Sequence, residues 1–367
     1  MPFFGAETIP DRSGLIAHEW GTFTSVAGES GSPEYWTTLS GPSDLPCFVN
    51  RIPGYNLKAA MGLVRMETPV LYFYAPRKTT LSVRVDFPQG IITEWYPQAK
   101  VKPATLMTQV ANGQIEWKGI EVLPGEQLEF PSSPGPSHYY AARATDSAPI
   151  RDGQQQEKLL FYRGMGHFSV PVLARFTREG QLEIRNAGAA PIPMAMVFEN
   201  RGGKLGYRRI AGLSGTRKVD PPELTGDLEA LRRDLADTLV ELGLYRKEAL
   251  AMIETWRDAW FEEGMRVIYT VPRAMVDEVL PLSIIPQPSS VARVFVGRVE
   301  VFSPSTEKAL RAALAAGDVP ALKKYARFLE PFMTQMGPAA MAPAARQFVD
   351  SRYRDAQREF YSPSCSQ

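Results

Sequence analysis

Cysteine and histidine are both scarce in this sequence, whose 367 residues contain two cysteines and three histidines. Cys47 and Cys365 allow at most one disulfide bond. Because Cys365 lies in a Ser- and Pro-containing tail with little to hold it, two unrelated thiols are the favoured interpretation. The sequence also lacks a P-loop, a Gly-x-Ser-x-Gly elbow, a His-Glu-x-x-His segment and a Cys-x-x-Cys pair. No compact catalytic or cofactor motif therefore indicates the function.

The chain has no excess of charge of either sign. Its 41 basic and 40 acidic residues give a net charge of +1. No overall field attracts nucleic acid or an anionic membrane, so we expect no nucleic-acid partner.

Long apolar stretches are missing as well. No window reaches the roughly 20 apolar residues that a membrane-spanning helix needs. Residues 1–17 include Glu7, Asp11 and Arg12 and so lack the uninterrupted apolar stretch of a signal peptide. We expect a soluble protein with no transmembrane segment, cytoplasmic as given or extracytoplasmic if a leader has been removed.

From Leu15 to about Leu213 the sequence shows the pattern of β-strands. Apolar and polar residues alternate over residues 81–87 and 168–176, as in half-buried strands. Short apolar runs at 70–74, 159–162 and 194–198 are bounded by Pro or Gly and indicate strands buried on both faces. The segment Asn200-Arg201-Gly202-Gly203 is a hairpin signal. Many short strands at this spacing predict an antiparallel sandwich or barrel.

The period changes near Pro221. Leucines spaced three or four apart predict a helix that Thr225 could cap and Gly243 could end, and a second helix follows up to Gly264. Strands return in residues 265–271 and 291–302, where Gly297 is a candidate β-bulge. Helices follow from Ser303, with Asp318 as a second cap and a last helix reaching about Phe360.

These patterns predict an α+β fold that is mainly antiparallel β and sandwich-like. They divide the chain into a β-rich domain at 1–222, a helical hairpin insertion at 223–264, strands returning to the β domain at 265–302 and a C-terminal helical segment at 303–367.

The three histidines lie beside aromatic residues at or near predicted strand ends and loops. His18 precedes Glu19-Trp20, His138 precedes two tyrosines, and His167 precedes Phe168. Three imidazoles with an open coordination position suit a catalytic zinc, and nitrogen-rich sites also suit copper or iron. We therefore predict that His18, His138 and His167 ligate a metal, with Glu19 as fourth ligand or general base. Three unrelated histidines that are hydrogen-bonded separately remain the alternative.

Two further groups could carry function. Glu254, Asp258 and Glu262 step by four residues and would form a carboxylate stripe on one helix face, opposite tryptophans in the core; a solvated face is the favoured interpretation. Aromatic residues near predicted loops could bind a glycan or a protein, although core packing is the commoner use of such side chains. The aromatic set is Trp20, Tyr35, Trp36, Trp95, Tyr96, Tyr139 and Tyr140.

Residues 18–24 (His-Glu-Trp-Gly-Thr-Phe-Thr), 66–74 and 254–264 resemble recurring blocks of a family of uncharacterised bacterial proteins. No activity is known for that family, so the resemblance implies no site residue. In some of its members the first block follows a secretion signal, which implies an extracytoplasmic location. Residues 1–17 of this chain depart from that pattern.

The sequence thus leaves two functions open. The first is a metal-dependent enzyme, a hydrolase rather than an oxidase because zinc needs no redox partner, with the three histidines as ligands. The second is a non-catalytic β-sandwich protein that recognises a glycan or a protein partner through aromatic loops. Partners are expected among small molecules, glycans and proteins.

Overall fold

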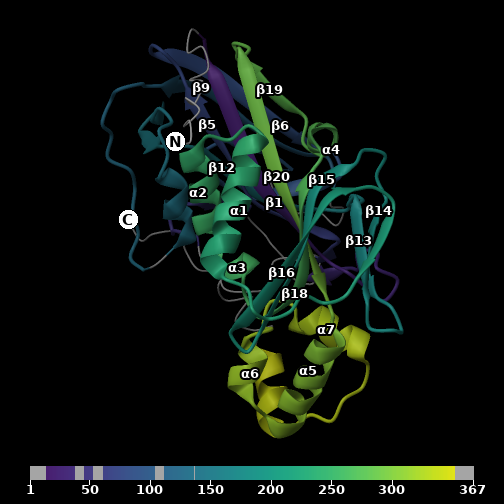
Figure 1. The fold of residues 1–367 in the computed structure, drawn as a ribbon. Coiled ribbons are helices and arrows are strands. Elements are labelled where there is room, and N and C mark those ends of the chain that lie inside the picture. Colours follow the sequence, from purple (N-terminus) through teal and green to yellow (C-terminus); the bar gives the residue numbers. More distant parts are fainter. Residues whose placement is uncertain (1–13, 38–44, 53–60, 104–110, 136, 352–367) are drawn as a thin grey trace.

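The computed structural model describes residues 14–37, 45–52, 61–103, 111–135 and 137–351. Its centre is a nine-stranded sheet in which only β1 and β20 pair in parallel. The helices of residues 303–351 gather at one end of the molecule (Figure 1). The strands lie in the order β16 (Lys204–Leu213), β15 (Ile192–Arg201), β18 (Gly264–Val271), β20 (Ser290–Val301), β1 (Ile16–Val26), β5 (Val64–Tyr74), β12 (Leu160–Gly166), β7 (Gly90–Tyr96) and β3 (Asn50–Arg51).

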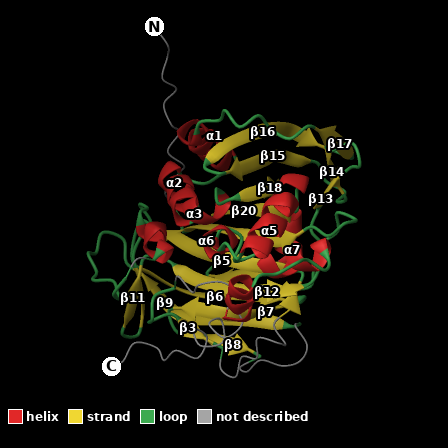
Figure 2. Cartoon of the chain, turned by 90° about the horizontal axis from the view of Figure 1, so that it is seen from below, coloured by secondary structure: helices red, strands yellow, loops and turns green. Residues whose placement is uncertain are grey.

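Smaller sheets pack against the central one and give the fold its sandwich character (Figure 2). One has the order β11 (Gln155–Glu157), β10 (Ile150–Asp152), β9 (Gly113–Val122), β6 (Thr79–Phe87) and β19 (Leu282–Ile285), with β8 (Lys100–Lys102) also paired to β9. Another consists of β13 (Val172–Phe176), β14 (Leu182–Asn186) and β17 (Thr216–Val219), and a short ladder joins β2 (Trp36–Thr37) to β4 (Met61–Gly62). The predicted α+β class, mainly antiparallel β, is confirmed.

Alternation of apolar residues explains how the sandwich closes. In β6 the side chains of Leu81, Val83, Val85 and Phe87 are buried, as the sequence predicts, and they join a single core with residues of the central sheet. The hairpin between β15 and β16 turns at Gly202 and Gly203, which both have positive φ as a two-residue hairpin requires.

Helices cover the opposite face of the central sheet. The helical hairpin comprises α1 (Leu228–Glu241) and α2 (Arg246–Thr255), followed by the short α3 (Arg257–Trp260). Together with the 3-10 helix η2 (His138–Arg143), these elements bury a second core against the sheet. Asp227 caps α1 by accepting a hydrogen bond from the Glu229 amide, so the cap lies two residues beyond the predicted Thr225.

The remaining helices are α4 (Arg273–Val279), α5 (Pro304–Ala316), α6 (Val319–Lys323) and α7 (Leu329–Met336). Ser303 and Asp318 cap α5 and α6, as predicted. The last three helices form a third core with Val26 and Trp36 at the end of the sheet. The predicted last helix runs into residues outside those described.

Three neighbouring strands change register at the same level of the central sheet. The β1–β5 ladder shifts between Trp20 and Thr22, and the β5–β12 ladder shifts between Phe161 and Gly164. Thr68, which lies at this level of β5, has a φ of 47°, an uncommon conformation for a β-branched residue. Since a shift of one residue exchanges the two faces of a strand, Met66 belongs to the sandwich core and Val70 to the helical one.

Gly297 is not a β-bulge, because β20 keeps an unbroken register with β1 and β18 across it. A Cβ atom at this position would lie 1.9 Å from the Tyr269 ring, which packs over the strand. The sequence suggests the bulge because Val294 and Val296 fall on one face of the strand and Val299 and Val301 on the other. Arg298 and Glu300 are buried on the helical face, where the pattern leads one to expect apolar side chains.

Cys47 is disulfide-bonded. The interpretation of the cysteines as unrelated thiols is therefore wrong for Cys47, which is tied by a covalent link. Cys365 lies outside the described residues.

Candidate functional site

Each of the three histidines has its own partner. The His18 Nδ1 lies 2.8 Å from Glu248 Oε2 beneath α2, and both side chains are buried. The His138 Nε2 pairs with Asp258 Oδ2 at 2.7 Å. His167 follows β12, and its ring meets the Tyr35 ring edge to face.

The strand register separates two of these histidines. His18 pairs with Tyr72 of β5, whereas Gly166, the neighbour of His167, is level with Val64 of β5. These two levels are eight positions apart on β5, about 26 Å at about 3.3 Å per residue. A metal bonds imidazole nitrogens at about 2 Å. The structure therefore does not bring His18 and His167 together.

Glu19 lies on the other face of β1 from His18, because successive side chains of a strand alternate. It is fully buried in the sandwich core, where the Tyr162 hydroxyl donates to its Oε1 and Arg293 Nε donates to its Oε2 at 2.5 Å. Arg293 also binds Asp277 at 2.8 Å. Glu19 thus holds a buried ion pair and is not placed to act as a base beside His18.

The carboxylate stripe does not form, since the helix is interrupted at Trp256 between α2 and α3. Glu254 pairs with Arg232 and Arg257, Asp258 with His138, and Glu262 with Arg298. The expectation that the tryptophans face the core is confirmed, because Trp256 and Trp260 are buried.

Most of the aromatic set is also in the core. Tyr35 has 56% of its surface exposed and Tyr140 is half-buried. The others, Trp20, Trp36, Trp95, Tyr96 and Tyr139, are buried. A broad aromatic recognition surface is therefore absent from this set.

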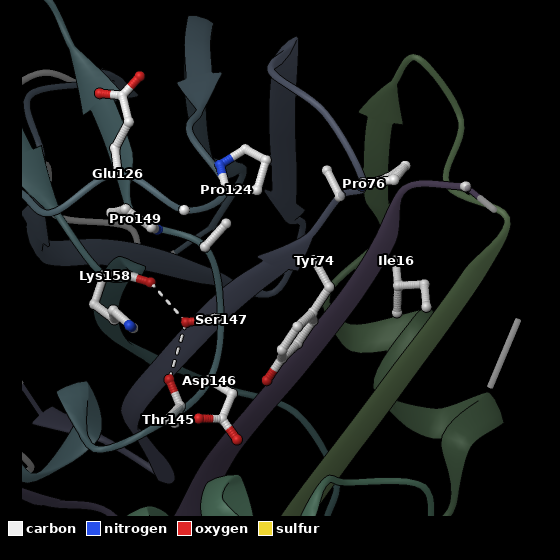
Figure 3. A pocket seen from close by; sticks show the side chains of 14 residues that line it. Ile16, Tyr74, Pro76, Pro124, Glu126, Thr145, Asp146, Ser147, Pro149 and Lys158 are labelled. Carbon is white, nitrogen blue, oxygen red and sulfur yellow. Dashed lines mark hydrogen bonds between the residues drawn. The ribbon is translucent and has the colours of Figure 1, made fainter. Parts of the chain in front are cut away.

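A cavity of about 500 Å³ opens where β1 begins and β5 ends (Figure 3). Its wall includes Ile16, Tyr74 and Lys158, together with residues 124–126 and 145–149. Lys158 lies with Ser147 and Thr145 on one side, while Tyr74 and Ile16 lie on the other (Figure 3). The size is ordinary for a pocket that accepts a small molecule.

The ionisable groups of the cavity differ in how they are paired. Asp146 accepts from Lys247 Nζ at 2.5 Å, and Glu126 pairs with Arg151 at 3.3 Å. The Lys158 ammonium has no hydrogen-bond or ion-pair partner among the described residues. Burial lowers the pKa of Lys158, and the nearby Asp146 opposes that shift. The cavity therefore has one ammonium group that makes no direct hydrogen bond or ion pair with the described residues.

The hydroxyl groups of the cavity are oriented by their own hydrogen bonds. Ser147 Oγ donates to the Lys158 carbonyl at 3.2 Å and lies 2.9 Å from Thr145 Oγ1. Because the Ser147 hydrogen is used, Thr145 donates to Ser147. Each hydroxyl supplies one hydrogen, so what remains for a ligand on both side chains is lone pairs.

A buried polar cluster supports the Tyr74 side of the cavity. The Tyr74 hydroxyl donates to Glu248 Oε1, and the Tyr245 amide donates to Glu248 Oε2, both at 2.8 Å. The His18 ring packs on the Tyr245 ring with a centroid distance of 4.5 Å. Burial and the Glu248 charge raise the pKa of Tyr74 far above its ordinary value, so this hydroxyl keeps its proton. The cluster fixes Tyr74 between β5 and α2.

Sequence reasoning found His18 but missed Lys158, Thr145, Ser147 and Tyr74 as site residues. They come from three separate segments, the end of β5, residues 145–147 and the residue before Leu159, with no common spacing. No local signal marks an unpaired lysine, because its pairing depends on which side chains the fold brings near it.

Comparison with known proteins adds no family. No family model matches the chain, and no curated protein matches it significantly. Among the described residues, no helix is long and apolar enough to cross a membrane. No group of three His, Cys, Asp or Glu side chains arranged to hold a metal is found in that part of the chain either.

Proposed function

We propose that the protein binds a small organic anion in the cavity beside β1 and β5, with Lys158 as the counter-charge. The observation that carries this proposal is the pairing within the cavity. Both acidic side chains of the wall, Asp146 and Glu126, have cationic partners, whereas Lys158 has none among the described residues. A partly desolvated ammonium gains most from an anion that replaces its lost water.

The orientation of the hydroxyls narrows the class of ligand. Thr145 and Ser147 offer lone pairs, and the Tyr74 hydrogen is used by Glu248. A ligand that places a carboxylate at Lys158 satisfies these acceptors best if it also carries a hydroxyl donor. A small hydroxycarboxylate has both groups.

The two functions suggested by the sequence have different support. The strand register gives no support to a hydrolase with a three-histidine metal centre, because His18 and His167 lie far apart. Recognition of a ligand without catalysis agrees with a cavity whose polar groups are held by the fold. Binding is therefore the activity that we assign to this cavity.

Calorimetric titration of the full chain with lactate, malate, citrate and acetate tests the proposal. We expect saturable binding of at least one hydroxycarboxylate, tighter than that of acetate. Lys158→Met should weaken it roughly 10- to 150-fold, since a hydrogen bond to a charged group contributes about 1.5–3 kcal/mol.

Lys118→Met is the matched control, because Lys118 is an exposed lysine of β9 outside the cavity wall. It should bind as the unmodified protein does. Absence of binding to all four acids, or equal affinity in Lys158→Met and the control, would overturn the proposal.

A further inference from the structure

A groove of about 640 Å³ lies next along the chain from the cavity. Residues 124–126 line the cavity, and residues 127–131 of the same connecting segment line the groove. The other walls are Tyr96 at the end of β7 and residues 154–156, which include the turn between β10 and β11. One connection thus contributes to two hollows with different linings.

The groove is rich in amides and has no cationic side chain. Its wall holds Gln127, Gln154, Gln155 and Gln156, with Glu129 as the one charged residue. Gln127, Glu129 and Gln154 are exposed, and their side chains make no hydrogen bond to other described residues. Amides donate and accept equally, which matches hydroxyl groups better than it matches an anion.

Aromatic side chains form the apolar part of the groove. Phe130 is half-buried. The Arg143 Cζ lies 5.4 Å from the centroid of the Phe130 ring, and two nitrogens of the same guanidinium donate to Glu157. Tyr96 is buried, with 4% of its surface exposed, and packs against Phe48, so Phe130 is the aromatic ring of the groove that a ligand can contact. The Tyr96 hydroxyl has no hydrogen-bond partner among the described residues, and burial with the Glu157 charge raises the pKa of Tyr96 to about 12. The hydroxyl is thus a protonated donor at physiological pH.

We propose that this groove binds a neutral carbohydrate chain, independently of the anion in the cavity. Sugar rings present an apolar face to an aromatic ring and hydroxyls at their edges, and the groove supplies both complements. An anionic glycan is disfavoured, because Glu129 would repel it and no lysine or arginine lines the groove. Of the aromatic set singled out in the sequence, Tyr96 alone is among the residues that line this groove, and Phe130 was not in that set.

Saturation-transfer NMR and calorimetry with neutral oligosaccharides test the inference on the full chain. The probes are gluco-, xylo-, manno- and chito-oligosaccharides of four to six units, with an oligogalacturonate as the anionic comparison. We expect one neutral series to bind saturably and the oligogalacturonate not to bind. The double variant Gln127→Ala/Gln154→Ala should weaken binding about tenfold, since it removes two neutral hydrogen-bonding groups.

Two controls separate this site from the anion cavity and from misfolding. Gln181→Ala, on the turn before β14 and outside the groove, should leave sugar affinity unchanged, and so should Lys158→Met. Because both substituted glutamines of the double variant are exposed, its thermal midpoint should equal that of the unmodified protein. Failure of all four neutral series to bind at 10 mM, capture of the anionic glycan alone, or unchanged affinity in the double variant would overturn the inference.

Discussion

The interior of the central sheet and the cavity at its edge differ in how their charged side chains are paired. On the helical face, Arg266 and Arg298 are fully buried, and both donate to Glu300. At the cavity, Lys158 is only half-buried and has no partner among the described residues. The difference indicates that the buried network belongs to the architecture, whereas the cavity retains a charge that a ligand can satisfy.

His18 and Glu19 of β1 both belong to the paired, buried kind, although they lie on opposite faces of the sheet. Glu19 faces the sandwich core and is held by Tyr162 and Arg293. His18 faces the helices and is held by Glu248. The side chains predicted to be a metal ligand and a general base thus connect β1 to neighbouring elements through buried hydrogen bonds.

The largest effect should follow from removing the shared carboxylate of the buried network. Glu300→Gln leaves Arg266 and Arg298 with a weaker acceptor in a site closed to water. We expect a loss of about 3–5 kcal/mol in the free energy of unfolding, measured by urea denaturation. Glu307→Gln, which breaks an exposed pair with Arg311, should cost less than about 1 kcal/mol. Equal losses in the two variants would remove the distinction between interior and edge.

An intermediate effect is expected at the cluster behind the cavity. Tyr74→Phe removes a donor from the fully buried Glu248 and should cost about 1–3 kcal/mol of unfolding free energy. Tyr207→Phe is the control, since the Tyr207 hydroxyl makes no hydrogen bond to other described residues. Thermal and urea unfolding of the two variants measure the difference. A neutral Tyr74→Phe would show that Glu248 does not depend on this hydroxyl.

The smallest effect should come from Lys158→Met. Because this ammonium has no partner to lose, we expect the unfolding free energy to stay within about 0.5 kcal/mol of the unmodified protein at pH 7. Ligand affinity, by contrast, should fall at least tenfold. A loss of several kcal/mol would mean that Lys158 supports the fold and would break the comparison.

The pH dependence gives the sign of the Lys158 contribution. Burial lowers the pKa of Lys158, so the unfolded chain binds its proton more tightly. Any destabilisation is present below the folded pKa and disappears as the pH rises toward the ordinary lysine value of about 10.4. Anion affinity should decline over the same range. Comparing unfolding curves and titrations of the unmodified protein and Lys158→Met between pH 7 and 10 measures both trends.

Much of the fold could be predicted because strand and helix periods are local. The alternation in β6, the hairpin at Gly202 and Gly203 and the cap at Ser303 each depend on a few neighbouring residues. The prediction was wrong where a distant contact decides. Gly297 is needed for the Tyr269 ring, which lies on a neighbouring strand. The helix break at Trp256, between α2 and α3, was also missed.

The site was harder to predict because pairing is a property of space. The sequence by itself determined the α+β class and the apolar faces, since burial of alternating side chains requires only local periodicity. Only the tertiary structure decided that His18 binds Glu248, 230 positions away in the chain. It also decided that Lys158 lies beside Thr145 and Ser147 without a direct ion-pair partner among the described residues. The energy of an electrostatic interaction depends on the distance between the two groups in the folded chain, so their spacing in the sequence does not specify it.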